Sequence, residues 1–261
     1  MFADYHKKSG LPHAGGICAL LLASLLASAQ TVTPPSATPP PAPSGAPASG
    51  APEAARTAPA PQRTQPRFLV FLDAAHGGAD TGARLSSQLL EKDLVLTMSV
   101  RLRSILNAHG IAVLTSRESD GLIPAVTRAE EADHAIPSAC IILHATASGN
   151  GIHLFTSSLT AIPTTRFLPW DTAQGAYVEQ SQRLSSEIDS AMTHAEIPVT
   201  LGRTALQPLD SFTCPAVAVE VAPLLRSASV TPVSDAEYQN RILQTLATAL
   251  EQWEKDWRQH P

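Results

Sequence analysis

The chain has 261 residues, of which 44% are hydrophobic and 16% charged, with a formal net charge of −5 at pH 7. This length suffices for one or two domains with a sizeable core. Because contacts with phosphates need a basic surface, the acidic balance and the lack of a Lys/Arg-rich block beyond the N-terminus argue against nucleic acid as a partner.

The first 29 residues have the layout of a secretory signal peptide. Lys7 and Lys8 precede an apolar stretch at 17–26, and residues 27–29 (Ala-Ser-Ala) form an A-x-A cleavage site. The apolar run is short for a membrane span, so we expect cleavage, no stable span afterwards, and export to the periplasm or cell envelope. A retained membrane anchor is the alternative, and a lipoprotein anchored through Cys18 is a weaker one.

Residues 30–66 hold half of the 22 prolines of the chain and almost no large apolar side chains. Such a segment cannot bury enough surface to offset the entropy of ordering it. We therefore expect an extended, semi-rigid linker that leads to a folded domain at 67–261.

Strand-like and helix-like segments alternate from residue 67 onwards. The first is a continuous apolar run, typical of a strand buried on both faces, and the next is a helix with an apolar period from Leu90 to Ile105 and a stop at Gly110. In chain order the predicted segments are strand 67–73, helix 90–110, strand 111–117, helix 124–135, strands 139–145 and 151–157, helix 174–195, strand 216–222 and helix 235–258. This alternation predicts an α/β fold, a three-layer sandwich with a largely parallel sheet flanked by helices.

Side chains with chemical potential gather where the predicted strands end, which is where such sheets bind ligands. His76 follows the first strand, His144 ends the strand at 139–145, and Glu220 lies near the end of the strand at 216–222. Glu91 begins the helix after a glycine-rich loop. Two imidazoles and one carboxylate form a catalytic zinc set with a fourth position for water, and the remaining glutamate could act as general base.

The order and spacing of these residues resemble the zinc-dependent N-acetylmuramoyl-L-alanine amidases, which cut stem peptides from the glycan of peptidoglycan. The resemblance covers about residues 67–255 and rests on motifs that follow one another along the chain. These are His76-Gly77-Gly78 with Asp80, Gly82 and Glu91-Lys92-Asp93, then Thr115-Ser116-Arg117 with Asp120, Arg128, the strand ending in His144, Gly151-Ile152-His153-Leu154-Phe155, and Pro215-Ala216-Val217-Ala218-Val219-Glu220.

By position, the resemblance implies a phosphorylase/hydrolase-like amidase fold with Zn²⁺ bound by His76, Glu91 and His144. Glu220 would be the catalytic carboxylate, taking a proton from water and passing it to the departing amine. The implied substrate is peptidoglycan and the expected state is a monomer, while the need for an activator protein stays open.

The chain departs from the family pattern around this set of residues. Ala74 and Ala75 replace a Pro-Gly pair, Thr146 replaces Asn or Asp, and Ala222 stands where the pattern has a phenylalanine. These changes bear on substrate fit and rate. Two rival functions therefore remain: a catalytically impaired peptidoglycan-binding domain, and another zinc peptidase that acts within the stem peptide.

Several neighbouring residues have open roles. His153 is a weaker candidate for the second histidine ligand, and Asp73 and Asp80 are expected to support the ligands or a turn. Arg203 would contact acid groups of the substrate or form a surface ion pair.

Two further features are less informative. Residues 157–173, with Arg166, Phe167 and Trp170, would form a packed loop or, as the less favoured option, line a glycan groove. Export would permit a disulfide between Cys140 and Cys214, but their spacing cannot establish one, and we expect them to be unpaired.

Overall fold

The computed structural model describes residues 67–163 and 167–259, all within one compact unit, Pro61–Pro261. The predicted signal peptide at 1–29 and linker at 30–66 lie outside these residues. Within the two described ranges, no helix is long and apolar enough to span a membrane.

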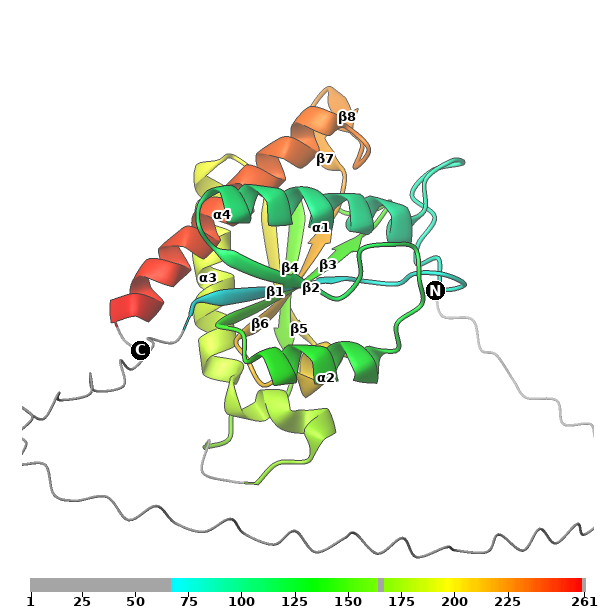
Figure 1. Ribbon diagram of the computed structural model, residues 1–261. Helices are drawn as coiled ribbons and strands as arrows, with labels where there is room; N and C mark the ends of the chain where they lie inside the picture. Colours follow the sequence, from blue (N-terminus) through cyan, green and yellow to red (C-terminus); the bar gives the residue numbers. More distant parts are fainter. Residues whose placement is uncertain (1–66, 164–166, 260–261) are drawn as a thin grey trace, which may run out of the picture. The chain divides into compact units, whose positions relative to one another are not determined.

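A six-stranded sheet forms the centre of the domain (Figure 1). Its strands are β1 (Leu69–Ala74), β2 (Ala112–Thr115), β3 (Ala139–Ala145), β4 (Ile152–Ser157), β5 (Val199–Thr204) and β6 (Ala216–Val221). Their order across the sheet is β2-β1-β3-β6-β4-β5, and every pairing is parallel except that between β6 and β4. The predicted largely parallel sheet is therefore confirmed.

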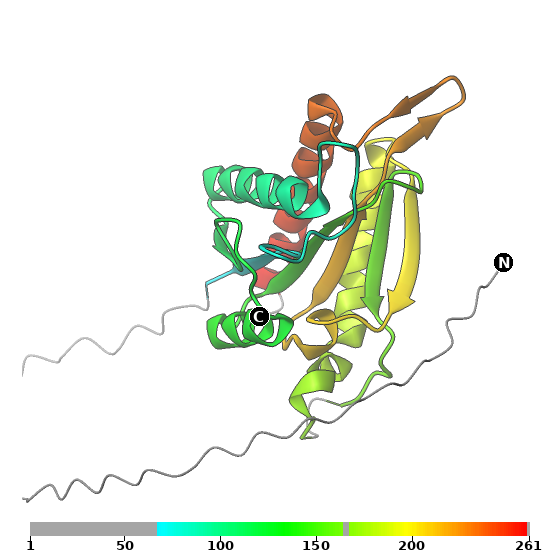
Figure 2. The same cartoon turned by 90° about the vertical axis from the view of Figure 1, so that its right-hand side faces the viewer.

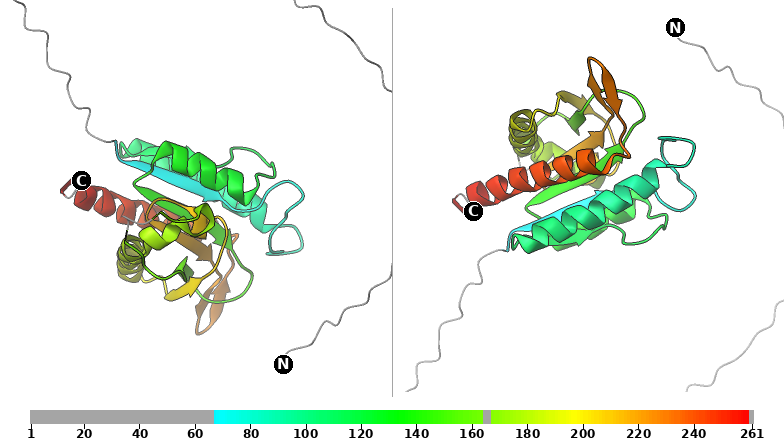
Figure 3. Two further views of the ribbon diagram at one scale, coloured as in Figure 1. Left: turned by 90° about the horizontal axis from the view of Figure 1, so that it is seen from below. Right: turned by 90° about the horizontal axis from the view of Figure 1, so that it is seen from above.

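Helices cover both faces of this sheet, which confirms the three-layer architecture. The helices are α1 (Glu91–Ala108), α2 (Ala125–Ala135), α3 (Val178–His194) and α4 (Ala236–Gln259), with short 3₁₀ helices η1 (Trp170–Ala176) and η2 (Leu209–Ser211). Figure 1 shows α1 and α2 on opposite sides of the sheet, and Figure 3 shows α1 and α4 lying side by side.

Strand alternation divides the core into two clusters, one on each face of the sheet. Leu72, Leu143 and Val219 belong to the larger cluster, which includes the apolar stripes of α1, α3 and α4. Phe71 and Ile142, one residue away from these in their strands, point to the other face and pack with α2 and η2. Because successive strand residues alternate between faces, the apolar runs at 67–73 and 139–145 supply both clusters.

Some elements of the fold are absent from the sequence-based prediction. Strand β5 is an edge strand in which half of the residues are polar and none is fully buried, so it lacks the apolar run that marked the other strands. A two-stranded hairpin, β7 (Leu224–Arg226) and β8 (Ser229–Thr231), follows β6 and extends away from the body of the domain (Figure 2). Its strands of three residues each are too short to show a period.

The structure differs from two further expectations, one about a pair of cysteines and one about a loop. Cys140 and Cys214 form a buried disulfide, because the parallel pairing of β3 with β6 brings their Cα atoms to 6.2 Å. In the loop at 157–173, which was expected to pack, Ser157 is buried but Phe167 and Trp170 are 102% and 62% exposed. Arg166 lies outside the described residues.

Candidate active site

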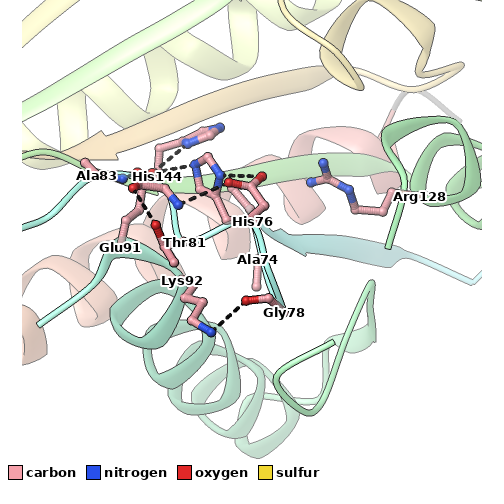
Figure 4. A network of polar contacts seen from close by, with 12 residues as sticks. Ala74, His76, Gly78, Thr81, Ala83, Glu91, Lys92, Arg128 and His144 are labelled. Atoms are coloured by element: carbon pink, nitrogen blue, oxygen red, sulfur yellow. Dashed lines mark hydrogen bonds and ion pairs between the residues drawn. The ribbon is translucent and has the colours of Figure 1, made fainter. Parts of the chain in front are cut away.

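The candidate site lies at the edge of the sheet where β1, β3 and β6 end and β4 begins. This edge collects His76 from the loop after β1, Glu91 from the first turn of α1, and His144 from β3. One ligand atom from each of these three side chains lies within 4.8 Å of the other two. Figure 4 shows the three side chains pointing toward one another.

The distances between the three side chains are short. Nε2 of His76 lies 3.2 Å from Oε1 of Glu91, and Nδ1 of His144 lies 2.8 Å from the same oxygen. The two imidazole rings meet edge to face with their centroids 5.3 Å apart. Both rings thus direct one nitrogen at a single carboxylate oxygen.

Glycines allow the loop between β1 and α1 to bring His76 against Glu91. His76 itself has a left-handed backbone, with φ 63°, and Gly77, Gly78 and Gly82 also have positive φ. At Gly82 a Cβ atom would lie 2.6 Å from both Oε2 of Glu91 and Cδ2 of His76. Only glycine leaves room for these two side chains to approach each other.

The start of α1 is bonded to this loop instead of to a capping side chain. The N–H of Glu91 donates to the carbonyl of Ala83 at 2.9 Å, and the N–H of Ala83 donates to Oε2 of Glu91 at 2.7 Å. The N–H of Ala145 donates to Oε1 at 3.1 Å. The first bond satisfies the leading N–H group of the helix, and the other two fix the Glu91 carboxylate between the loop and β3.

The contacts of Glu91 also set its ionisation state. The side chain is buried, and burial alone would raise its pKa, but hydrogen bonds with both histidines and the two backbone N–H groups hold the pKa well below the usual range. The hydrogen bond with Glu91 raises the pKa of His76 against the opposing effect of burial, and Asp80 adds to the rise. Glu91 is therefore ionised at neutral pH, as a metal ligand must be.

Asp80 lies behind His76 and contacts the ring nitrogen that does not face Glu91. Its Oδ2 is 2.9 Å from Nδ1 of His76, and its Oδ1 accepts a hydrogen bond from the N–H of Gly82. Such a contact orients an imidazole and selects its tautomer. This is the supporting arrangement expected of Asp80.

A second group of charged side chains holds the loop in place. Arg117 is buried and donates to the carbonyls of Ala74, Ala75 and Lys92. Lys92 donates to the carbonyl of Gly78 and pairs with Asp120 at 2.6 Å; the bond to Gly78 is drawn in Figure 4. Sequence analysis assigned Arg117, Lys92 and Asp120 only to a motif, because each of them contacts backbone that is distant in the chain.

Asp73 of β1 was expected to support a ligand or a turn, but it forms a buried ion pair with Arg128 of α2, at 2.6 Å. This pair joins α2 to the sheet. Arg203, which was expected to contact the substrate or to form a surface ion pair, donates to the backbone carbonyls of Ser157 and Leu159. These hydrogen bonds join β5 to the end of β4. They could not be predicted because β5 was not predicted as a strand.

Glu220 lies next to the three candidate ligands in the sheet but outside their cluster. In the strand pairing, Glu220 of β6 lies beside His144 of β3 on one side and His153 of β4 on the other. Oε2 of Glu220 lies 2.6 Å from Nδ1 of His153, and the Glu220 side chain is 30% exposed. The carboxylate is therefore partly exposed and paired with His153. His153 therefore contacts Glu220 and does not belong to the cluster of His76, Glu91 and His144.

The three clustered side chains fit a zinc ion. Two imidazole nitrogens and one carboxylate oxygen are a common catalytic zinc donor set. The separations of 3.2 and 2.8 Å between the facing atoms compare with the roughly 3.3 Å expected for two ligands at tetrahedral zinc. The fold and the site together define a three-layer α/β domain with a candidate metal centre at the strand ends.

Comparison with known proteins identifies the family. The family model described as N-acetylmuramoyl-L-alanine amidase matches residues 70–252, and the chain belongs to this family. The germination-specific N-acetylmuramoyl-L-alanine amidase of Bacillus subtilis is 28% identical over 189 residues, which cover 68% of this chain and 76% of that protein.

Two further comparisons agree with this assignment. N-acetylmuramoyl-L-alanine amidase AmiA of Salmonella typhimurium is 40% identical over 72 residues, and the match spans 28% of this chain and only 25% of AmiA. The catalytic domain of CwlV, an amidase of Bacillus (Paenibacillus) polymyxa, has the same fold with a TM-score of 0.57 and 19% identity, covering 72% of this chain and 98% of that domain.

Proposed function

We propose that this protein hydrolyses the amide bond between the lactyl group of N-acetylmuramic acid and L-alanine in peptidoglycan. The observation that carries the proposal is the convergence of His76, Glu91 and His144 on one point, with Glu220 on the adjacent strand. The match to the amidase family supports this choice of substrate.

His76, Glu91 and His144 are proposed to hold a zinc ion. The fit of the donor set, the ionised state of Glu91 and the support of His76 by Asp80 favour this assignment. When bound, zinc would supply Lewis-acid chemistry, activating water and polarising the amide carbonyl.

Glu220 is proposed to move the proton in this reaction. Its carboxylate accepts a proton as the water oxygen bonds to the carbonyl carbon, and then delivers that proton to the nitrogen of L-alanine as the C–N bond breaks. The products are an unsubstituted lactyl carboxylate on the glycan and a free stem peptide. The partial exposure of Glu220 is compatible with direct contact between its carboxylate and the substrate.

The test is the variant Glu220→Gln in the full-length chain, with Glu130→Gln as a control for the loss of an exposed glutamate elsewhere. We expect Glu220→Gln to lose about 10²- to 10⁴-fold in kcat while it retains zinc, and Glu130→Gln to remain active. Release of stem peptides from purified sacculi, followed by mass spectrometry, measures the rate and identifies the cleaved bond. A zinc-loaded wild-type chain that releases no stem peptide would contradict the proposal.

The same measurement separates the two rival functions. A catalytically impaired peptidoglycan-binding domain would sediment with sacculi and release nothing, with or without the Glu220→Gln change. A zinc peptidase acting within the stem peptide would yield shortened peptides still attached to muramic acid.

We also propose the domain organisation and location predicted from the sequence: a signal peptide at 1–29, a linker at 30–66 and a catalytic domain at 67–261, exported to the periplasm or cell envelope. The disulfide between Cys140 and Cys214 supports export, because disulfides persist in oxidising compartments. Determining the N-terminus of the exported protein by mass spectrometry tests the cleavage site. Activity of the purified chain alone would show that no activator is needed, and light scattering would test the expected monomer.

A further inference from the structure

We infer that His153 is a positioning residue, which holds the Glu220 carboxylate in its reactive orientation through a hydrogen bond from Nδ1. The inference rests on the proposed function, since it concerns the partner of the proton-transferring group of that reaction. It assigns His153 a role distinct from the metal ligation considered from the sequence.

The geometry of the sheet places these two side chains together. His153 and Glu220 are direct partners in the antiparallel pairing of β4 with β6, so both side chains leave the same face of the sheet. Nδ1 of His153 lies 2.6 Å from Oε2 of Glu220, a short distance for a hydrogen bond between an imidazole and a carboxylate. This bond engages one carboxylate oxygen and leaves Oε1 to exchange a proton with water or substrate.

The imidazole of His153 is itself confined by its neighbours. A Cβ atom at Gly149 would lie 2.4 Å from Cε1 and 2.6 Å from Nε2 of His153, so the backbone of Gly149 lies directly against the ring. The ring of Phe155 meets the imidazole edge to face, with centroids 6.4 Å apart, and Phe155 in turn lies against Gly202 of β5. The side chain of His153 is only 17% exposed. These contacts restrict rotation of the ring.

This confinement has a consequence for Glu220. A glutamate side chain has several rotatable bonds, and a carboxylate that is 30% exposed would sample several orientations in water. A hydrogen bond from a confined ring selects one of them. Because a displacement of about 1 Å from the reactive geometry can lower a rate by roughly 100-fold, the bond should affect kcat more than substrate binding.

The first test compares His153→Leu, which removes the donor, with His153→Asn, whose amide nitrogen can replace Nδ1. Both are made in the full-length chain and assayed for kcat and KM on purified peptidoglycan, for zinc content and for thermal unfolding. We expect His153→Leu to lose about 10- to 100-fold in kcat with KM and zinc content unchanged, and His153→Asn to recover most of that loss. Wild-type kcat in His153→Leu, a loss confined to KM, loss of zinc, or no recovery in His153→Asn would each overturn the inference.

The second test moves the ring without changing it. In Gly149→Ala the added methyl group would collide with the imidazole, whereas in the control Gly110→Ala a Cβ atom meets nothing within 4 Å. Both glycines have positive φ, 96° and 83°, so both variants carry similar backbone strain. We expect a lower kcat in Gly149→Ala alone. Wild-type kcat in Gly149→Ala would overturn the inference even if His153→Leu does not fold.

The outcomes separate this inference from the proposed function. A zinc-loaded wild-type chain without amidase activity overturns both. An active wild type that is inactivated by Glu220→Gln but unaffected by His153→Leu overturns the role of His153 and leaves the proposed function standing.

Discussion

The two candidate histidine ligands present different ring nitrogens to Glu91. His76 directs Nε2 at the carboxylate because Asp80 occupies its Nδ1, whereas His144 directs Nδ1 at the same oxygen. Each imidazole therefore directs one of its nitrogens at Oε1 of Glu91. The left-handed backbone of His76, φ 63°, is the kind of strained conformation that functional sites retain when the surrounding loop fixes it.

Measuring zinc affinity distinguishes a residue that binds the metal from a residue that only orients a ligand. We expect Asp80→Asn to lower zinc affinity by about 10- to 100-fold, the usual effect of losing a supporting carboxylate, and His144→Ala to lower it by more. Competition with a chromophoric chelator measures both affinities. Equal zinc affinity in His144→Ala and the wild type would show that the cluster is not the metal site.

At the scale of elements, α4 holds the strand ends that carry the site. The hydroxyl of Tyr238, near the start of α4, shares its single O–H between the carbonyl of Ala222 after β6, at 3.0 Å, and that of Gly151 before β4, at 3.3 Å. Ala222 also donates its own N–H to the Gly151 carbonyl. Because these contacts involve the backbone, the alanine at position 222 keeps them despite its departure from the family pattern.

We expect Tyr238→Phe to lower the free energy of unfolding by about 1 kcal/mol at neutral pH, because it removes the donor of these hydrogen bonds. Burial raises the pKa of Tyr238 to about 12. The protonated form is thus favoured in the folded state, and its contribution should be complete below the unfolded pKa of about 10 and disappear as the pH rises from there through 12. Urea unfolding of both proteins across this range measures the difference. A difference that stays constant from pH 9 to 12 would contradict this assignment.

The prediction of elements succeeded where a segment carries its own signal. The apolar runs and helical periods identified β1, β3, β6, α1 and α4 to within a few residues. Strand β5 was missed because an edge strand needs no apolar face, and its Gly202 serves the ring of Phe155 instead. Nothing in the local sequence indicates that β4 runs antiparallel to β6.

At the scale of the whole molecule, the disulfide between Cys140 and Cys214 joins segments 74 residues apart. It lies in the smaller core cluster, near Phe212, at the amino end of β3. His144 is at the carboxyl end of the same strand, so the disulfide and the candidate site lie at opposite ends of β3.

We therefore expect Cys140→Ala/Cys214→Ala to lower the free energy of unfolding by about 2–4 kcal/mol and to leave kcat unchanged at temperatures where the domain stays folded. Guanidinium unfolding of the oxidised wild type, the reduced wild type and the double variant measures the stability change. The reduced wild type should behave like the double variant. Equal stability of all three would show that the disulfide does not contribute.

The amino-acid sequence by itself determined the residue types of the site, the α/β class and the family, because ligand chemistry, apolar periodicity and motif spacing are local properties of the chain. Only the tertiary structure decided that β6 lies between β3 and β4, which sets Glu220 between His144 and His153. Strand order and direction depend on backbone pairing between distant segments, and no local pattern encodes that pairing. The pairing of Glu220 with His153 could therefore be recognised only in the tertiary structure.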